Sequence, residues 1–97
     1  MGDVGLTPRV MTRIRRDFPN RQEDVAKILE RSISGNQDRE RLVAAIILSA
    51  NGDMRRLHRV VELSRLDWRD ALVAGGLANE DWAQRLDAEF GPAEDHG

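Results

Sequence analysis

The run Leu42-Val43-Ala44-Ala45-Ile46-Ile47-Leu48 decides the fold of this chain. An α-helix completes a turn every ~3.6 residues, so an unbroken apolar run of this length covers its whole circumference. A helix with no polar side is stable only where its neighbours cover it on every side. We therefore expect the helix that starts after Asp38 and carries this run to be the central element of the core.

Amphipathic helices are predicted on both sides of this run. Each follows a residue whose side chain can accept hydrogen bonds from free N–H groups at a helix start. In chain order they are residues 8–18 capped by Thr7, residues 21–32 capped by Asn20 and ended by Ser34-Gly35-Asn36, the segment between Asp53 and Asp67, the segment between Asp67 and Gly75-Gly76, and the segment between Asn79 and Gly91-Pro92. We predict an all-α fold, a compact bundle of five or six short helices around a buried central helix.

Two further features support this arrangement. Asn51-Gly52 supplies the left-handed conformation that closes the central helix, and Gly75-Gly76 followed by Leu77 has the pattern of a Schellman ending. Trp68 and Trp82 fall on the apolar faces of the last two predicted helices, and we expect both to pack at the edge of the bundle.

The size of the chain allows one core. It has 97 residues, of which 40% are hydrophobic and 33% charged, which is typical of a soluble globular domain. We expect residues 1–6 to be a disordered N-terminus, residues 7–91 a single helical domain and residues 92–97 a frayed tail. No window approaches the ~20 apolar residues of a membrane-spanning helix, and no signal-peptide run opens the chain, so we expect a cytoplasmic protein that does not associate with membranes.

Side chains that could carry catalysis are sparse. The chain has no cysteine, and its serines lie in no nucleophile motif. His58 and Glu62 are one helical turn apart and make half of a metal site, whereas zinc takes about three or four ligands from a protein. The paired acids lie near helix starts, where the helix dipole favours them. We therefore expect no catalytic residue, no metal and no cofactor.

Charge is distributed unevenly along the chain. The net charge is −2, yet residues 1–65 carry 13 basic and 9 acidic side chains, and residues 66–97 carry 2 and 8. The first predicted helix has a basic stripe made of Arg9, Arg13 and Arg16. The last predicted helix carries the acids Glu80, Asp81, Asp87 and Glu89. We expect these two surfaces to pair, either within one chain or between two chains of a homodimer.

The arginines also supply a candidate interaction surface. Its members lie on the first and fourth predicted helices and are Arg9, Arg13, Arg16, Arg55, Arg56 and Arg59. The segment around Gly52 has the outline of a helix-turn-helix, whose second helix reads DNA. That alignment places Asn51, Asp53 and His58 at positions that are normally apolar, and the overall acidity lowers affinity for phosphates. We therefore do not expect nucleic acid as the partner.

The second half of the chain has a recognisable pattern. It consists of Ala50-Asn51-Gly52-Asp53 followed by Leu66-Asp67-Trp68-Arg69-Asp70-Ala71-Leu72-Val73-Ala74-Gly75-Gly76-Leu77-Ala78-Asn79-Glu80-Asp81-Trp82. This pattern resembles small uncharacterised helical proteins common in high-GC bacteria. The resemblance implies kinship and supplies no function, cofactor or site residue.

Three functional hypotheses follow from the sequence. The first is a non-enzymatic protein–protein interaction module with an unknown protein partner. The alternative is a nucleic-acid-binding helical protein that uses the arginine faces of the first and fourth helices. The third is an enzyme, which would require a deep pocket converging on His58.

Overall fold

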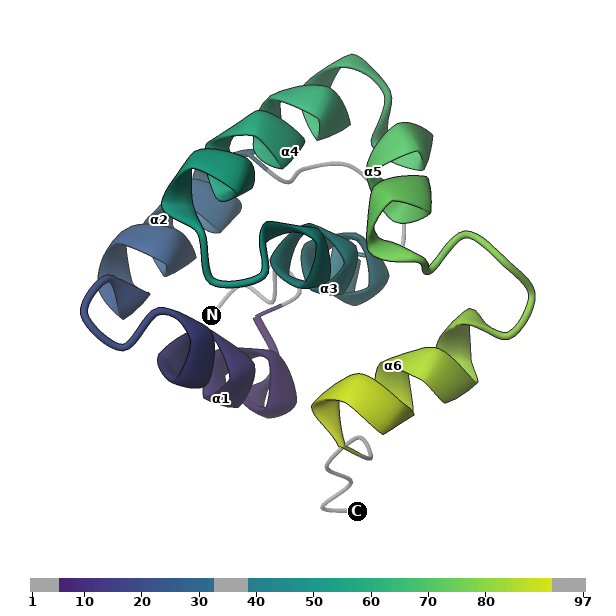
Figure 1. The fold of residues 1–97 in the computed structure, drawn as a ribbon, viewed down its shortest axis with the longest axis horizontal. Helices are drawn as coiled ribbons and strands as arrows, with labels where there is room; N and C mark the ends of the chain where they lie inside the picture. The colour runs from purple at the N-terminus through teal and green to yellow at the C-terminus, as the bar shows by residue number, and fades with distance from the viewer. Residues whose placement is uncertain (1–5, 33–38, 92–97) are drawn as a thin grey trace.

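Six α-helices form the described part of the chain, residues 6–32 and 39–91 of a computed structural model (Figure 1). They are α1 (Pro8–Asp17), α2 (Gln22–Ser32), α3 (Arg39–Ala50), α4 (Met54–Leu66), α5 (Trp68–Gly75) and α6 (Trp82–Phe90). These two ranges contain no strand. The predicted all-α bundle of short helices is confirmed.

Helix α3 is the buried centre of the bundle, as its apolar run predicts. Every residue from Leu42 to Ile47 is at most 4% exposed, and Ala50 is fully buried. Leu48 is half-buried and is the one member of the run that reaches solvent. The expectation of a central helix covered on nearly all sides is therefore confirmed.

The remaining helices surround α3. Helices α4 and α5 make the most extensive contacts with α3 and also pack against each other, while α1 packs on α2 and α3. In Figure 1, α4 and α5 lie on one side of α3, and α1 and α6 lie on the other. Trp68 and Trp82 are half-buried and pack against the core. Both therefore lie at the edge of the bundle, as the sequence predicts.

A close approach of two backbones sets the distance between α3 and α5. A Cβ atom added at Gly75, the last residue of α5, would lie 2.5 Å from the Cα of Ala45 and closer still to its carbonyl oxygen. No side chain fits into that space, so only glycine permits the contact. The sequence shows this glycine as part of a helix end and does not reveal its packing role.

Two of the predicted N-caps form as expected. Asp53 accepts a hydrogen bond from the N–H of Arg55 at 2.9 Å, and Asp67 accepts one from the N–H of Arg69 at 3.0 Å. Each bond satisfies a backbone donor that the first helical turn leaves free. The capping explanation for Asp67 is therefore confirmed.

The predicted left-handed turns are also present. Asn51 and Gly52 have φ values of 50° and 78°, and Gly76 has a φ of 77°. The N–H of Leu77 donates to the carbonyl of Leu72 at 2.9 Å, which completes a Schellman ending after α5.

The predicted caps Asn20 and Asn79 are wrong. Helix α2 begins at Gln22, and α6 begins at Trp82. In each case a backbone hydrogen bond closes a turn before the helix, which moves the helix start beyond the asparagine. Capping patterns indicate that a helix begins nearby, but turn geometry decides at which residue.

Thr7 occupies the predicted N-cap position of α1 but does not cap the helix with its side chain. Its hydroxyl instead donates to Glu40 on α3 at 2.6 Å. Pro8 stands at the start of the helix as expected, and α1 ends at Asp17, one residue before the predicted Phe18. The Thr7 hydroxyl therefore donates to a carboxylate on another helix and does not accept a hydrogen bond from a backbone N–H of its own helix.

Some expectations fall on residues 1–5, 33–38 and 92–97, which lie outside the described ranges. They are the cap at Asp38, the end of the second helix at Ser34-Gly35-Asn36, and the two terminal segments apart from Leu6, which packs against the core. Among the described residues, no helix combines the length and the apolar character needed to traverse a bilayer.

Substitution Gly75→Ala tests the contact between α3 and α5. Helix propensity alone would favour alanine by up to about 1 kcal/mol. Overlap with the backbone of Ala45 should reverse the sign and lower the free energy of unfolding by about 1 to 3 kcal/mol. Thermal unfolding followed by circular dichroism measures the change.

Ala74→Gly is the matched control, because Ala74 lies on the same helix and is exposed. It should lower the free energy of unfolding by up to about 1 kcal/mol, from helix propensity alone. A Gly75→Ala protein that melts at or above the wild-type temperature would contradict the close approach.

Candidate functional site

The fold divides the predicted arginine surface into buried and exposed parts. The side chains of Arg9 and Arg13 are 8% and 13% exposed, whereas that of Arg16 is 73% exposed. The remaining members are all exposed on α4 and are Arg55, Arg56 and Arg59. Helix α1 therefore contributes one strongly exposed arginine to this set.

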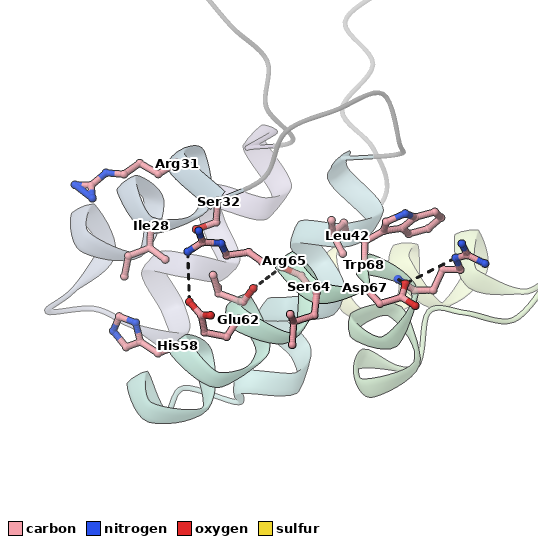
Figure 2. A pocket seen from close by; sticks show the side chains of 13 residues that line it. Ile28, Arg31, Ser32, Leu42, His58, Glu62, Ser64, Arg65, Asp67 and Trp68 are labelled. Atoms are coloured by element: carbon pink, nitrogen blue, oxygen red, sulfur yellow. Dashed lines mark hydrogen bonds and ion pairs between the residues drawn. The ribbon is translucent and has the colours of Figure 1, made fainter.

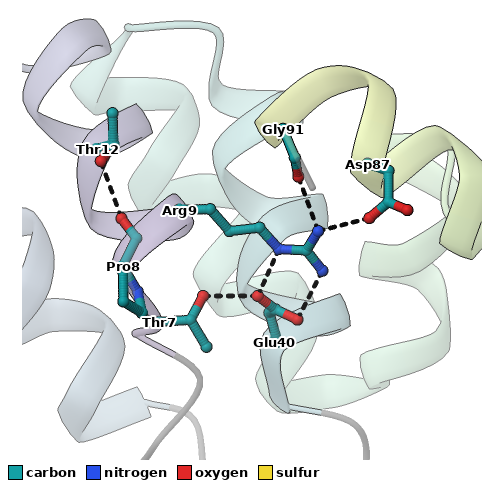
Figure 3. A network of polar contacts seen from close by, with 7 residues as sticks. All are labelled: Thr7, Pro8, Arg9, Thr12, Glu40, Asp87 and Gly91. Carbon is teal, nitrogen blue, oxygen red and sulfur yellow. Dashed lines mark hydrogen bonds and ion pairs between the residues drawn. The ribbon is translucent and has the colours of Figure 1, made fainter. Parts of the chain in front are cut away.

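Arg9 is the centre of a polar network that joins three helices (Figure 3). Its Nε and Nη2 donate to the two carboxylate oxygens of Glu40 on α3, at 2.8 and 3.0 Å. Its Nη1 donates to Asp87 on α6 at 2.6 Å and to the carbonyl oxygen of Gly91 at 2.9 Å. A guanidinium that bridges two carboxylates fixes the orientation of α1, α3 and α6 relative to one another.

Two more arginines hold α6. Arg13 donates to the carbonyl oxygen of Glu89 at 2.7 Å, and its guanidinium carbon lies 5.2 Å from the ring centroid of Phe90. Arg41 on α3 lies 4.6 Å from the ring centroid of Trp82 and donates to a main-chain carbonyl between α5 and α6 at 2.9 Å. Each guanidinium thus combines a hydrogen bond with a cation–π contact.

The Arg9–Glu40 contact changes the acidity of both groups. The pKa of Glu40 is lowered chiefly by the hydrogen bond from Arg9 and further by that from Thr7, while burial acts in the opposite direction. The pKa of Arg9 is raised chiefly by its hydrogen bond to Glu40, again against the effect of burial. The pair is therefore fully charged near neutral pH.

The expected pairing between α1 and the last helix occurs within the chain for two arginines. Arg9 contacts Asp87, and Nη1 of Arg13 lies 3.6 Å from Oε1 of Glu89. Nε of Arg16 instead lies 3.8 Å from a carboxylate of its own helix. Two of the expected acidic partners form no ion pair within the described residues, namely Glu80 and Asp81.

The turn between α3 and α4 is not packed as in a helix-turn-helix. Asn51, Asp53 and His58 are all exposed, although their counterparts in that motif are apolar and packed. Gly52 lies against α1, since a Cβ there would be 3.3 Å from the carbonyl oxygen of Asp17. The packing at this turn therefore differs from that of a helix-turn-helix, which is in line with the poor fit of its sequence to that motif.

A groove opens where α2, α4 and the start of α5 meet (Figure 2). Its volume is about 990 Å³, at the upper end of the range for ligand pockets. Its apolar lining is Ile28, Leu42, Val61, Leu66 and Trp68. Its polar lining is Arg31, Ser32, His58, Glu62, Ser64, Arg65, Asp67 and Arg69. Most of these polar side chains are exposed, so the groove is an open surface feature.

An exposed leucine is part of the lining of this groove. Leu66, the last residue of α4, is 85% exposed, while Trp68 and Ile28 are half-buried beside the groove. Leu66 is more exposed than the other large apolar side chain on the described surface, Val73 at 66%. Apolar and charged groups are therefore interleaved over a short distance.

The charged lining is partly paired. Nη1 of Arg65 lies 3.4 Å from Oε2 of Glu62, and Nε of Arg69 lies 3.8 Å from Oδ1 of Asp67. Arg31, which enters from α2, forms no ion pair with any residue in the described ranges. The groove therefore carries more positive than negative charge.

His58 and Glu62 both line the groove, as their spacing on one helix face predicts (Figure 2). Within residues 6–32 and 39–91, no group of three or more His, Cys, Asp or Glu side chains is placed to hold a metal ion. A histidine that acts as a general base is usually oriented by a second group. No described residue gives His58 such a hydrogen bond, so the pair forms part of a polar wall.

No family model, curated protein or solved structure matches the chain.

Sequence patterns did not predict the groove, because its walls come from helices that are far apart in the chain. One signal was present. Leu66 precedes the cap Asp67 and falls outside the apolar stripe of its helix, which Leu57, Val60 and Val61 define. An apolar residue outside the buried stripe of its helix is a candidate for contact with a partner. Only the position of α2 in the fold makes this residue part of a groove.

Glu40→Gln tests the central ion pair. At pH 7 the substitution should lower the free energy of unfolding by about 2 kcal/mol, because Arg9 loses its charged acceptor. Folding lowers the pKa of Glu40 from its ordinary value of 4.5, so this stability is present above pH 4.5 and is lost as pH falls below it. The difference between the two proteins should therefore shrink from pH 7 to pH 3 in urea unfolding experiments.

Glu62→Gln serves as the control, since Glu62 pairs with Arg65 at an exposed position. It should change stability by less than about 0.5 kcal/mol at either pH. A Glu40→Gln difference that stays constant over the whole pH range would show that the carboxylate charge does not stabilise the fold.

Proposed function

We propose that this protein is a non-enzymatic protein–protein interaction module and that its partner docks in the groove between α2, α4 and α5. The observation that carries the proposal is the 85% exposure of Leu66 at the edge of a groove that also contains Trp68 and Ile28. Single exposed apolar residues are common, but one that lines a groove together with other partly exposed apolar side chains extends a recognition surface.

The chemistry of the groove suits a protein partner. Covering the side chain of Leu66 would contribute roughly 1.5 to 3 kcal/mol of hydrophobic free energy. Trp68 is of a residue type that often dominates binding energy at interfaces. The exposed polar lining can form the hydrated rim that surrounds such a centre.

Leu66→Asp and Val73→Asp form a matched pair for testing this proposal. Both residues are exposed, so neither substitution should change the melting temperature by more than a few degrees. Each tagged protein would be used to capture partners from the cell of origin, with quantification by mass spectrometry. We expect a partner that wild type and Val73→Asp retain equally and that Leu66→Asp loses by about tenfold or more. Equal recovery by all three proteins would contradict docking in the groove.

Nucleic-acid binding is the second candidate, and one observation favours it. Three of the four exposed arginines of α4 form no ion pair with any other described residue. They are Arg55, Arg56 and Arg59. On α1, by contrast, Arg9 and Arg13 are engaged with α3 and α6, which leaves a small basic surface on a protein of net charge −2.

A gel-shift titration separates the two candidates. We expect no shift of duplex DNA at submicromolar protein and physiological salt, because three solvated arginines neutralise few phosphates. A salt-dependent shift that Arg55→Glu abolishes and Arg15→Glu leaves intact would favour nucleic acid as the partner. Arg15 is an exposed arginine on α1 and controls for the loss of one positive charge.

A further inference from the structure

We infer that the partner segment which occupies the groove is an acidic amphipathic peptide of another protein, with apolar side chains on one face and carboxylates beside them. This inference rests on the proposed function and adds the chemical character of the ligand. It follows from the sign and position of the charges that surround the apolar side chains of the groove.

The groove is framed by arginines from three helices. Arg31 belongs to α2, Arg65 to α4 and Arg69 to α5. The side chains of Arg65 and Arg69 are 62% and 75% exposed, and Arg31 is also exposed. All three guanidinium groups can therefore reach a bound molecule while their backbones stay in place.

The two carboxylates in the lining do not neutralise the positive charge of these three arginines. Asp67 caps α5 through the N–H of Arg69, and Glu62 lies 3.4 Å from Arg65. No acid in the described ranges pairs with Arg31. Arg55 and Arg59 continue the exposed face of α4 and add two positive charges beside the groove. On a protein with net charge −2, this face has the opposite sign to the molecule as a whole.

Apolar side chains are interleaved with these arginines. Ile28 and Val61 form part of the lining between α2 and α4, and Trp68 and Leu66 form part of it where α4 meets α5. A helix that lies in a groove presents apolar side chains at i, i+3 or i+4, and i+7, with its polar residues on either side. Carboxylates at those flanking positions would meet Arg31 on one side and Arg65 or Arg69 on the other.

The same lining disfavours two other occupants. A nucleic acid gains little from the exposed apolar side chain of Leu66, and three arginines neutralise only a few of its phosphates. In a second copy of this chain, the acidic helix α6 packs its apolar side chains on its own core, and its acids Asp87 and Glu89 already contact Arg9 and Arg13, so it offers no free amphipathic acidic face. A separate acidic segment therefore complements the groove best.

Three synthetic helical peptides of equal length test the inference by fluorescence anisotropy. The first has leucines at i, i+3 and i+7 with glutamates elsewhere, the second has lysines in place of the glutamates, and the third has serines in place of the leucines. Wild type should bind the first peptide at least about tenfold more tightly than either of the others. Raising the salt concentration should weaken this binding.

The double variant Arg31→Glu/Arg65→Glu should lose about tenfold or more in affinity for the leucine–glutamate peptide and gain affinity for the leucine–lysine peptide. Its matched control is Arg15→Glu/Arg16→Glu, which makes the same charge change on the exposed side of α1 and should bind as wild type does. Circular dichroism confirms that both variants are folded.

Several outcomes would overturn the inference. They are equal binding of the acidic and basic peptides, no binding of any peptide by wild type, displacement of the acidic peptide by an oligonucleotide of equal charge, and a concentration-dependent dimer that Leu66→Asp abolishes. The proposed function is judged separately by partner capture with Leu66→Asp and Val73→Asp. A partner lost with Leu66→Asp but retained by Arg31→Glu/Arg65→Glu would sustain the proposed function and overturn the acidic-ligand inference.

Discussion

The absence of a solvated side on most of α3 is the constraint on which the rest of the structure depends. From Leu42 to Ile47 no residue is more than 4% exposed, so the other helices must cover this one from several directions. Apolar surface left in water would cost roughly 25 cal/mol per Å². Small residues make the covering possible at one point, because Ala45 and Gly75 allow the backbones of α3 and α5 to meet.

Helix α6 is held by a different kind of interaction. It contributes the buried Leu86 and the half-buried Trp82 and Phe90, while arginines of α1 and α3 bind its acidic side chains, its carbonyl groups and its rings. An exposed ion pair is worth only ~0.2 to 1 kcal/mol, but Arg9 is 8% exposed and uses several donors at once. Such a network fixes the orientation of α6, a helix that buries little apolar surface against the core.

The groove arises at a corner that the core leaves open. Helix α4 ends at Leu66, Asp67 starts α5 in a new direction, and α2 lies alongside α4 without closing the corner. The arginines on α1 and those around the groove illustrate two uses of one residue type. Arg9 is enclosed by acceptors from its own chain, whereas Arg31 and Arg65 lie where a partner can reach them.

The sequence by itself determined the features that depend on neighbours within one or two helical turns. The apolar run of α3 and the caps at Asp53, Asp67 and Gly76 are of this kind, because backbone periodicity and a missing Cβ act locally. Only the tertiary structure decided that the Thr7 hydroxyl serves Glu40 instead of its own helix. The burial of Arg9 and the groove also required the full fold, because they join residues from helices that are distant in sequence and meet only once α3 is covered.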